Sequence, residues 1–377
     1  MNFSIIAKSK LPIDFINELN HDFTERNVDK ILTGMSEERY TTFRVNYLKS
    51  NENEVEDELL KNGVEFDKLS ITETECETDS ETYFNFNAYV VYNKNEKDLS
   101  KLKIYEDGKI YVQSISSMIP PIILRPEPGE RVLDIAAAPG SKTTQMATMM
   151  NNEGYILANE IDKFRCEKLK YNVEKQGASI VHIINKDGTQ LNNNVKSFDK
   201  ILVDVPCTGE GRFIVSNKKT YEHWSLKMQK ELVEIQKKLL SNAINLCKTN
   251  GTILYSTCAL SLAENERVID WALKNFNIDI EKIYLNINME ENKDITKNDK
   301  IEKNQTIAKN ADIKNSTSFI LKGNKKGLSD EVKNTIKILP NKLLEGFYVT
   351  KIKKLRIITA KNKKTTDKMI SVAWRIK

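Results

Sequence analysis

Leu133-Asp-Ile-Ala-Ala-Ala-Pro-Gly-Ser-Lys-Thr143 is the stretch that decides the fold. An apolar run at 131–135, which predicts a strand, leads into small residues and then into a helix-like stretch that continues to Met150. Small residues let the backbone approach a ligand closely, and the first N–H groups of a helix bind its polar parts. The stretch therefore predicts a binding loop. The Gly-x-x-x-x-Gly-Lys spacing of a phosphate-binding loop is missing, which argues against phosphate binding in that mode.

Short apolar runs alternate with helical stretches on the C-terminal side of this loop. Strands that alternate with helices form a parallel sheet with helices on both faces, and such sheets bind ligands at the carboxyl ends of their strands. The fold class is therefore α/β. The expected strands are 155–158, 179–184, 200–203 and 252–255, the expected helices are 163–175 and 227–247, and the expected closing strands are 336–340 and 346–351.

The residues before this region predict a small α+β domain, 1–110, and the α/β domain follows at 111–353. Residues 286–330 are rich in Asn and Lys and predict an expanded surface loop or a partly disordered insertion. Residues 354–377 form a basic tail. Within the first domain we expect helices at 13–32 and 55–62, strands at 42–48 and 110–113, and an acidic loop at 70–81.

The charge of the chain is unevenly distributed. The formal net charge is 58 − 53 = +5, but residues 50–100 hold 14 acids and 4 bases, whereas residues 350–377 hold 10 bases and 1 acid. The basic end is either a phosphate-binding surface or a solvated, Lys-rich segment. No apolar stretch approaches the ~20 residues that span a membrane, and the first residues lack a secretory signal. We therefore expect a cytoplasmic protein without membrane contact.

The five cysteines are Cys76, Cys166, Cys207, Cys247 and Cys258. They are widely spaced and form no Cys-x-x-Cys pair, so neither a metal site nor a disulfide framework is expected. Composition alone predicts free thiols in a reducing compartment at all five positions. The sequence contexts of Cys207 and Cys258 suggest a different role for those two.

Acidic residues follow three successive apolar runs. Glu160 comes 20 residues after Gly140, where a carboxylate can accept hydrogen bonds from ribose hydroxyls. Asp187 is placed to accept from an adenine amino group, and Asp204 follows the next run. Each acid alone could be an ordinary helix N-cap. Three of them in register with the loop instead indicate S-adenosylmethionine, which carries hydroxyls, amines and a positive sulfonium.

Two cysteines directly follow apolar runs, in Asp204-Val-Pro-Cys207-Thr-Gly and in Tyr255-Ser-Thr-Cys258. Carbon 5 of cytosine is a poor nucleophile, but a thiolate that adds to carbon 6 makes it reactive enough to accept a methyl group. A free thiol has a pKa of ~8.5, so a cationic neighbour helps; Lys142 and the sulfonium are candidates. Position alone does not decide which cysteine attacks.

Together these motifs resemble the Nol/Nop/Sun family of RNA cytosine-5 methyltransferases, which includes bacterial ribosomal RNA enzymes of the Rsm type. The resemblance implies a Rossmann-like class I methyltransferase sheet at 111–353 and makes residues 1–110 an RNA-binding extension. It covers about residues 10 to 353, without the Asn-rich insertion. The matching segments are Thr42-Phe-Arg-Val-Asn46, Tyr111-Val-Gln-Ser-Ile-Ser-Ser-Met118, Ala136 to Lys142, Asp187-Gly188, Asp204 to Cys207, Ser256-Thr-Cys258, Glu264-Asn-Glu266 and Glu345-Gly-Phe347.

The resemblance also implies roles. Cys258 attacks carbon 6 and Cys207 assists breakdown of the adduct, while Asp204 bonds the N3 side of the base and Lys142 contacts the base. Ala136 and Ser141 stand where the family often has Cys and Gly, and Glu160 stands where Asp is commoner. The implied cofactor-binding residues are Ala136, Ala137, Ala138, Pro139, Gly140, Ser141, Lys142, Glu160, Arg165, Asp187 and Asp204, with Glu160 and Arg165 at the ribose.

Alternative functions follow from the same features. Ribosomal RNA is the first expected substrate because the N-terminal extension resembles that of the bacterial ribosomal enzymes, and transfer RNA is the second. A DNA cytosine-5 methyltransferase would use the Pro-Cys at Cys207 as nucleophile, but the Ser-Thr-Cys258 motif argues against it. A non-catalytic RNA-binding ribosome-assembly factor on the same fold is the remaining alternative. We expect a monomer.

Overall fold

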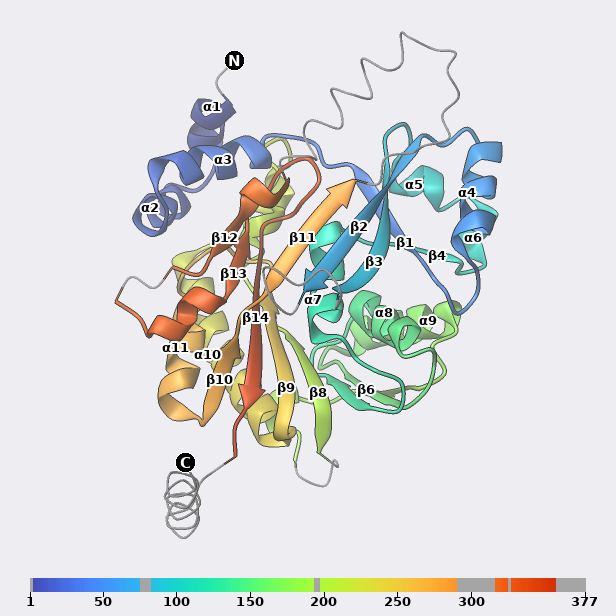
Figure 1. Ribbon diagram of the computed structural model, residues 1–377. Coiled ribbons are helices and arrows are strands. Elements are labelled where there is room, and N and C mark those ends of the chain that lie inside the picture. Colours follow the sequence, from blue (N-terminus) through green and yellow to red (C-terminus); the bar gives the residue numbers. More distant parts are fainter. Residues whose placement is uncertain (1–2, 75–82, 193–196, 290–315, 325–326, 357–377) are drawn as a thin grey trace, which may run out of the picture.

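The computed structural model describes residues 3–74, 83–192, 197–289, 316–324 and 327–356. Within these residues the strands form two sheets (Figure 1). The larger sheet has nine strands in the order β12-β13-β14-β9-β8-β5-β6-β7, and β10 pairs with β14. Its strands are β5 (Arg131–Asp134), β6 (Tyr155–Asn159), β7 (Val181–Ile184), β8 (Phe198–Asp204), β9 (Cys247–Thr257), β10 (Ile278–Glu281), β12 (Ile320–Lys322), β13 (Ile336–Ile338) and β14 (Phe347–Lys354).

The half of this sheet from β9 to β7 is parallel, and β14 joins it antiparallel to β9. The predicted strands of the α/β domain and the two predicted closing strands are thus confirmed. Because β8 and β9 are neighbours and run in the same direction, Asp204 and Ser256 lie side by side at their carboxyl ends. The parallel strands are buried on both faces of the sheet, which explains why the sequence shows nearly continuous apolar runs there.

Helices cover both faces of the larger sheet. One apolar cluster contains α7, α8 and α9 side chains, and the other contains α10 and α11 side chains. Helix α7 is not among the predicted helices, and it contains Pro120 and Pro121. The helices of this part are α7 (Ile115–Leu124), α8 (Ser141–Met149), α9 (Lys163–Gln176), α10 (Leu226–Leu246) and α11 (Glu266–Asn275), and the 3-10 helices are η1 (Gly188–Gln190), η2 (Glu210–Arg212), η3 (Lys218–Thr220), η4 (Ser316–Phe319) and η5 (Asp330–Asn334).

The smaller sheet is antiparallel and has the order β11-β2-β3-β1-β4. Its side chains share an apolar cluster with α7 and with the larger sheet, so the two sheets are packed into one core. The strands are β1 (Thr41–Val45), β2 (Phe66–Thr74), β3 (Tyr83–Val91), β4 (Ile110–Val112) and β11 (Tyr284–Met289), and the helices beside them are α4 (Glu52–Lys61), α5 (Glu96–Leu99) and α6 (Lys103–Glu106).

Two predicted loops are partly strands. The predicted acidic loop 70–81 begins inside β2, where alternate side chains are buried, and residues 75–82 lie outside the described residues. The predicted insertion 286–330 contributes most of β11, which pairs with β2, and also η4 and β12 (Figure 1). Residues 290–315 lie outside the described residues. The long-range pairing of β11 with β2 outweighs the polar composition of both segments.

The predicted helix 13–32 is two helices, α2 (Ile13–Asp22) and α3 (Glu25–Met35), because Phe23 and Thr24 are extended. With α1 (Phe3–Lys10) they form a helical layer that packs on Phe213, Trp224 and Leu260 rather than on the smaller sheet. Strand β4 crosses the predicted domain boundary at residue 110, and the division into domains stays a prediction. Among the described residues, no helix is long and apolar enough to cross a membrane.

Candidate active site

A cavity of about 840 Å³ lies at the carboxyl ends of the parallel strands. It brings together nearly all the side chains predicted for the site from segments far apart in the sequence. Gly140 lies outside the lining. The predicted residues that line the cavity are Ala136, Ala137, Ala138, Pro139, Ser141, Lys142, Glu160, Arg165, Asp187, Asp204, Cys207 and Cys258.

The loop between β5 and α8 is held from two sides. The Ala137 N–H donates to the Asn159 carbonyl at 2.7 Å, and Arg165 Nη2 donates to the Ala138 carbonyl at 2.7 Å. Gly140 has φ +106°, and a Cβ atom there would lie 2.9 Å from Leu169 Cδ1. Glycine is therefore required at this turn, because other residues rarely adopt that conformation and a side chain would meet α9.

Asp134, the last residue of β5, is a site residue that sequence reasoning missed. Its side chain lines the cavity although the residue is 1% exposed. Thr143 donates a hydroxyl hydrogen bond to Oδ2 at 2.7 Å, and Oδ1 has no hydrogen-bond partner among the described residues. Burial raises the pKa of Asp134 to about 7. Its place directly before the small-residue loop was the available signal.

Glu160 has the properties that a hydroxyl-binding carboxylate needs. It is 2% exposed, and Oε1 accepts the Asp162 N–H at 2.9 Å. Oε2 lies 3.5 Å from Arg165 Nη1 and has no hydrogen-bond partner within the described part of the chain. A buried carboxylate oxygen on a cavity wall without a donor fits a ribose hydroxyl, since buried polar atoms are normally hydrogen-bonded. This available acceptor thus fits the ribose of the predicted cofactor.

Asp187 is the N-cap of the 3-10 helix η1. This agrees with the alternative that each of the three acids is an ordinary helix N-cap. Oδ1 of Asp187 accepts from the N–H and the hydroxyl of Thr189 at 2.9 and 2.8 Å, and Oδ2 accepts from Gln190 at 2.9 Å. These bonds lower the pKa of Asp187, so its carboxyl stays ionised. The residue still lines the cavity, and its contact with adenine stays a prediction.

Lys142 and Asp204 form an ion pair in the cavity wall. Lys142 Nζ lies 2.7 Å from Asp204 Oδ2, and the Ser256 hydroxyl donates to Oδ1 at 2.8 Å. The Lys142 amine also lies 5.6 Å from the centre of the Phe347 ring. Because Lys142 lies in the first turn of α8 and Asp204 ends β8, the pair connects the predicted cofactor loop to the first cysteine motif.

The two cysteines predicted to react lie in contact. The Sγ atoms of Cys207 and Cys258 are 2.9 Å apart. The pKa of Cys258 is lowered, first by its hydrogen bond with Cys207 and also by the charge of Arg212. The pKa of Cys207 is raised well above its usual range, first by the same hydrogen bond and then by burial. This arrangement favours a thiolate at Cys258 and a thiol at Cys207.

Arg212 is a cavity residue that sequence reasoning missed. It lies in η2, which follows Cys207, and its pKa is raised mainly by Cys258. Lys142, the cation expected to activate the thiol, instead pairs with Asp204. Glu345 also lines the cavity and accepts a hydrogen bond from Ser114 at 3.0 Å. The signal for Arg212 was its position shortly after the Pro-Cys motif.

A buried carboxylate joins the two cysteine loops. Glu264 accepts the N–H of Thr208 at 3.0 Å and a hydrogen bond from Gln236 at 2.8 Å, and it also accepts the Thr208 hydroxyl. Its carbonyl oxygen accepts the Tyr255 hydroxyl at 2.6 Å. Burial raises the pKa of Glu264 to about 7. The residue after Cys207 is therefore fixed to the segment that follows Cys258.

The other cysteines lie away from the cavity. Cys166 and Cys247 are buried free thiols, and Cys76 lies outside the described residues. No group of three or more His, Cys, Asp or Glu side chains is arranged to hold a metal ion in the part of the chain that the structure describes.

Residues 121–353 match the family model described as 16S rRNA methyltransferase RsmB/F. The chain belongs to this family. It is 33% identical to a tRNA (cytosine(49)-C(5))-methyltransferase of Pyrococcus abyssi over 84% of this chain and 88% of the relative. It is 38% identical to the ribosomal RNA small subunit methyltransferase F of Escherichia coli over 50% of this chain. That match spans 40% of the relative's length.

Solved structures agree with the family. A methyltransferase homolog protein from Pyrococcus horikoshii superposes with a TM-score of 0.66 and 27% identity over 92% of this chain and all of that chain. NSun6 from Pyrococcus horikoshii, solved with SFG, gives a TM-score of 0.67 and 20% identity over 93% of this chain and all of that chain, which shows the fold. The predicted Rossmann-like methyltransferase fold is confirmed.

Family membership confirms the predicted enzyme class. The protein is an S-adenosylmethionine-dependent RNA (cytosine-5) methyltransferase of the RsmB/F family. The alternative of a DNA cytosine-5 methyltransferase is therefore wrong.

Proposed function

We propose that this RsmB/F-family protein methylates carbon 5 of cytosine in RNA with Cys258 as nucleophile and Cys207 as its partner. The observation that carries the proposal is the Sγ–Sγ distance of 2.9 Å between these residues in the cavity that also contains the Lys142–Asp204 ion pair. Arg212 is the cation that would favour the Cys258 thiolate, because its charge lowers the pKa of that thiol.

The cofactor-binding residues are those that the sequence predicted. S-adenosylmethionine, when bound, supplies the methyl group. The backbone of the loop 136–142 would hold its methionine part, Glu160 and Arg165 its ribose, and Asp187 its adenine. Oε2 of Glu160 supports this assignment, because it lies 3.5 Å from Arg165 Nη1 and accepts no hydrogen bond within the described residues. Asp134, with one carboxyl oxygen also unpartnered, is added to the site.

Cys258, Asp204 and Cys207 have different roles in the reaction on the base. The Cys258 sulfur forms a bond to carbon 6, which moves the electrons of the 5,6 double bond toward carbon 5. As the thiolate adds, N3 takes up a proton from solvent and the negative charge of the ring is neutralised. Asp204, held by Lys142 and Ser256, would accept the hydrogen bond from this N3–H. After the methyl group has passed to carbon 5, a water molecule acting as base takes the carbon 5 proton, the electrons of that bond restore the 5,6 double bond, and the Cys258 sulfur leaves carbon 6 as a thiolate. Cys207 is close enough to assist this last step.

Ribosomal RNA stays the substrate predicted from the sequence. Transfer RNA is a second candidate that one observation favours. The relative named as a tRNA methyltransferase matches over 88% of its length, whereas the relative named as a ribosomal RNA methyltransferase matches over 40%. Bisulfite sequencing of total RNA from a deletion strain distinguishes them, because the lost 5-methylcytosine identifies the RNA. The cytoplasmic location and the monomeric state also stay predictions.

Methyl transfer from radiolabelled S-adenosylmethionine to unmodified ribosomal and transfer RNA transcripts tests the proposal. We expect labelled 5-methylcytidine with the wild type, none with Cys258→Ala, and wild-type rates with the matched control Cys166→Ala, since Cys166 lies on α9. Full activity of Cys258→Ala would disprove the assigned nucleophile. Calorimetric titration with S-adenosylmethionine tests the proposed cofactor site, and a protein that bound no cofactor would contradict it.

A further inference from the structure

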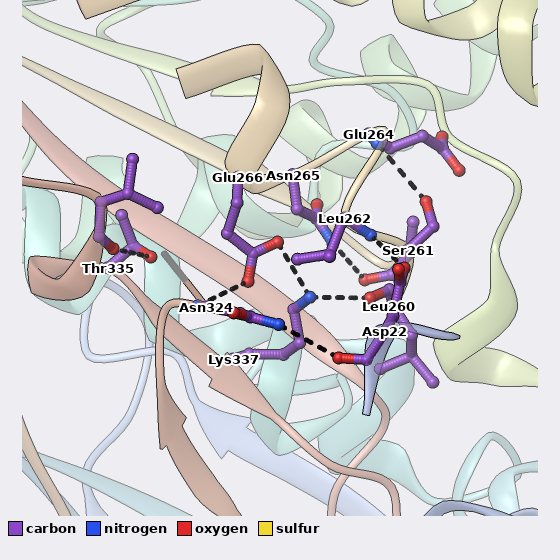
Figure 2. Close-up of polar contacts among 12 residues, drawn as sticks. Asp22, Leu260, Ser261, Leu262, Glu264, Asn265, Glu266, Asn324, Thr335 and Lys337 are labelled. Carbon is purple, nitrogen blue, oxygen red and sulfur yellow. Dashed lines mark hydrogen bonds and ion pairs between the residues drawn. The ribbon is translucent and has the colours of Figure 1, made fainter. Parts of the chain in front are cut away.

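A buried ion pair lies behind the segment that follows Cys258. Lys337 Nζ, on β13, lies 2.9 Å from Oε2 of Glu266, the first residue of α11, and both side chains are at most 3% exposed. The same amine donates to the Leu260 carbonyl at 2.8 Å. Figure 2 shows the Lys337 amine between these two acceptors. Lys337 thus ties β13 to a backbone oxygen two residues after Cys258.

The N-terminal helices reach the same segment. Asp22, at the end of α2, accepts the Leu262 N–H on Oδ2 at 2.9 Å, and its carbonyl accepts from Asn324 Nδ2 at 3.1 Å. The Asn324 N–H donates to Glu266 Oε1 at 3.3 Å. These contacts lie around Lys337 in Figure 2. The 259–265 segment is therefore linked both to the Lys337–Glu266 pair and to the helical layer α1–α3.

Glu210 holds the segment from the side of the Cys207 loop. Its Oε2 accepts the N–H groups of Leu260 and Ser261, both at 2.9 Å. The peptide unit between Leu260 and Ser261 therefore has its carbonyl bound to Lys337 and its N–H bound to Glu210. A peptide unit fixed at both ends cannot rotate without breaking a buried hydrogen bond, so the backbone directly after Cys258 is restrained.

The fold alone does not explain a buried ion pair at this place. Removing two charges from water costs free energy that their attraction only partly returns, and apolar side chains of similar volume often stabilise a protein as well or better. Loss of one partner is different, because it leaves an uncompensated buried charge. A pair that fixes a particular backbone oxygen next to a reactive residue has a use that apolar side chains would not supply.

We propose that Lys337 is a positioning residue for Cys258. By holding the Leu260 carbonyl while it neutralises Glu266, it fixes the 259–265 segment and thereby the direction of the Cys258 sulfur. Asp22 extends this restraint to the N-terminal helices, which belong to the predicted RNA-binding part. The inference deepens the proposed function and rests on Cys258 being the nucleophile.

The test measures how fast a covalent protein–RNA complex forms in the Cys207→Ala background, with S-adenosylmethionine and unmodified ribosomal and transfer RNA transcripts. With Lys337→Met added, we expect complex formation to slow at least ten-fold, while the calorimetric Kd for S-adenosylmethionine changes less than two-fold. The control is Lys351→Met. Lys351 lies on β14, the strand next to β13, and its part-buried ion pair with Glu73 on β2 has a distance of 2.8 Å. This variant should leave the rate within two-fold.

A second variant separates positioning from folding. Adding Glu266→Gln to Lys337→Met removes the unpaired buried charge, so we expect the Tm to return toward that of the parent. The Leu260 carbonyl still lacks its donor, and complex formation should stay at least ten-fold slow. Recovery of the rate together with the Tm, or an equal loss in Lys351→Met, would show that Lys337 serves folding alone and would overturn the inference. If the Cys207→Ala parent itself forms no complex, the proposed function fails first.

Discussion

The Sγ atoms of Cys207 and Cys258 lie 2.9 Å apart although 51 positions separate the residues in the sequence. They follow the parallel neighbours β8 and β9, whose carboxyl ends meet at one edge of the sheet. Two thiols in contact do not both ionise, because a hydrogen bond to one thiolate stabilises it and disfavours the second. Because Arg212 favours negative charge on Cys258, we expect Cys258 to be the thiolate nucleophile and Cys207 to keep its proton.

Glu160→Gln should weaken binding of S-adenosylmethionine about ten-fold, because it replaces a charged acceptor by a neutral one at a buried position. Calorimetric titration measures the Kd. Asp162→Asn is a suitable control, since Asp162 caps α9 beside Glu160 and its carboxylate already accepts the Arg165 N–H at 2.7 Å. An unchanged Kd in Glu160→Gln would remove Glu160 from the cofactor site.

Asp204→Asn should lower kcat about a hundred-fold, since loss of a group that stabilises developing charge typically has an effect of this size. The Kd for S-adenosylmethionine should rise less than ten-fold. Ser256→Ala, which removes one hydrogen bond to Asp204, should have a smaller effect of about ten-fold on kcat. Steady-state kinetics with saturating RNA measure both variants, and equal kcat values for Asp204→Asn and wild type would contradict the role on the base.

Arg212→Met should raise the pKa of Cys258. The guanidinium favours the thiolate, so its removal favours the thiol and shifts the rise of reactivity to higher pH. Iodoacetamide alkylation of Cys258, followed by mass spectrometry from pH 6 to 10, measures the midpoint. Lys218→Met, on the 3-10 helix after Arg212, should leave the midpoint in place. A midpoint that does not move in Arg212→Met would show that this cation does not activate Cys258.

Asp134→Asn should change how stability depends on pH. Burial raises the pKa of folded Asp134 to about 7, above its value in the unfolded chain. The folded state therefore resists ionisation, and the wild type loses stability as pH rises from about 4 to about 7. The variant lacks this loss and still offers an acceptor to Thr143. Its Tm relative to wild type, measured by calorimetry without cofactor, should rise across this window; a constant difference would contradict the assignment.

Much of the site could be predicted because it lies at strand ends. Asp204 ends one apolar run, and Lys142 and Cys258 lie in the short segments that follow two others. Parallel strands bring such residues to one edge. Arg212 could not be predicted in the same way, because it lies in a 3-10 turn whose direction depends on tertiary packing. Lys337 lies in the middle of a closing strand, where the sequence gives no sign that its amine reaches Leu260.

The fold was predicted best where periodic patterns are local. Strands β5, β6 and β8 are apolar runs that local patterns identify. Strand β11 has polar residues at alternate positions and pairs with β2, which lies about two hundred positions earlier in the chain. Such non-local pairing outweighs local propensity and cannot be read from composition.

The covalent complex tests the central claim most directly. Wild-type protein, Cys207→Ala, Cys258→Ala and the double variant are incubated with unmodified RNA transcripts and S-adenosylmethionine, and the products are separated on a denaturing gel. If Cys258 attacks carbon 6 and Cys207 assists release, a protein–RNA band accumulates in Cys207→Ala and is missing in Cys258→Ala and in the double variant. A band in Cys258→Ala that Cys207→Ala lacks would reverse the two roles and contradict the account.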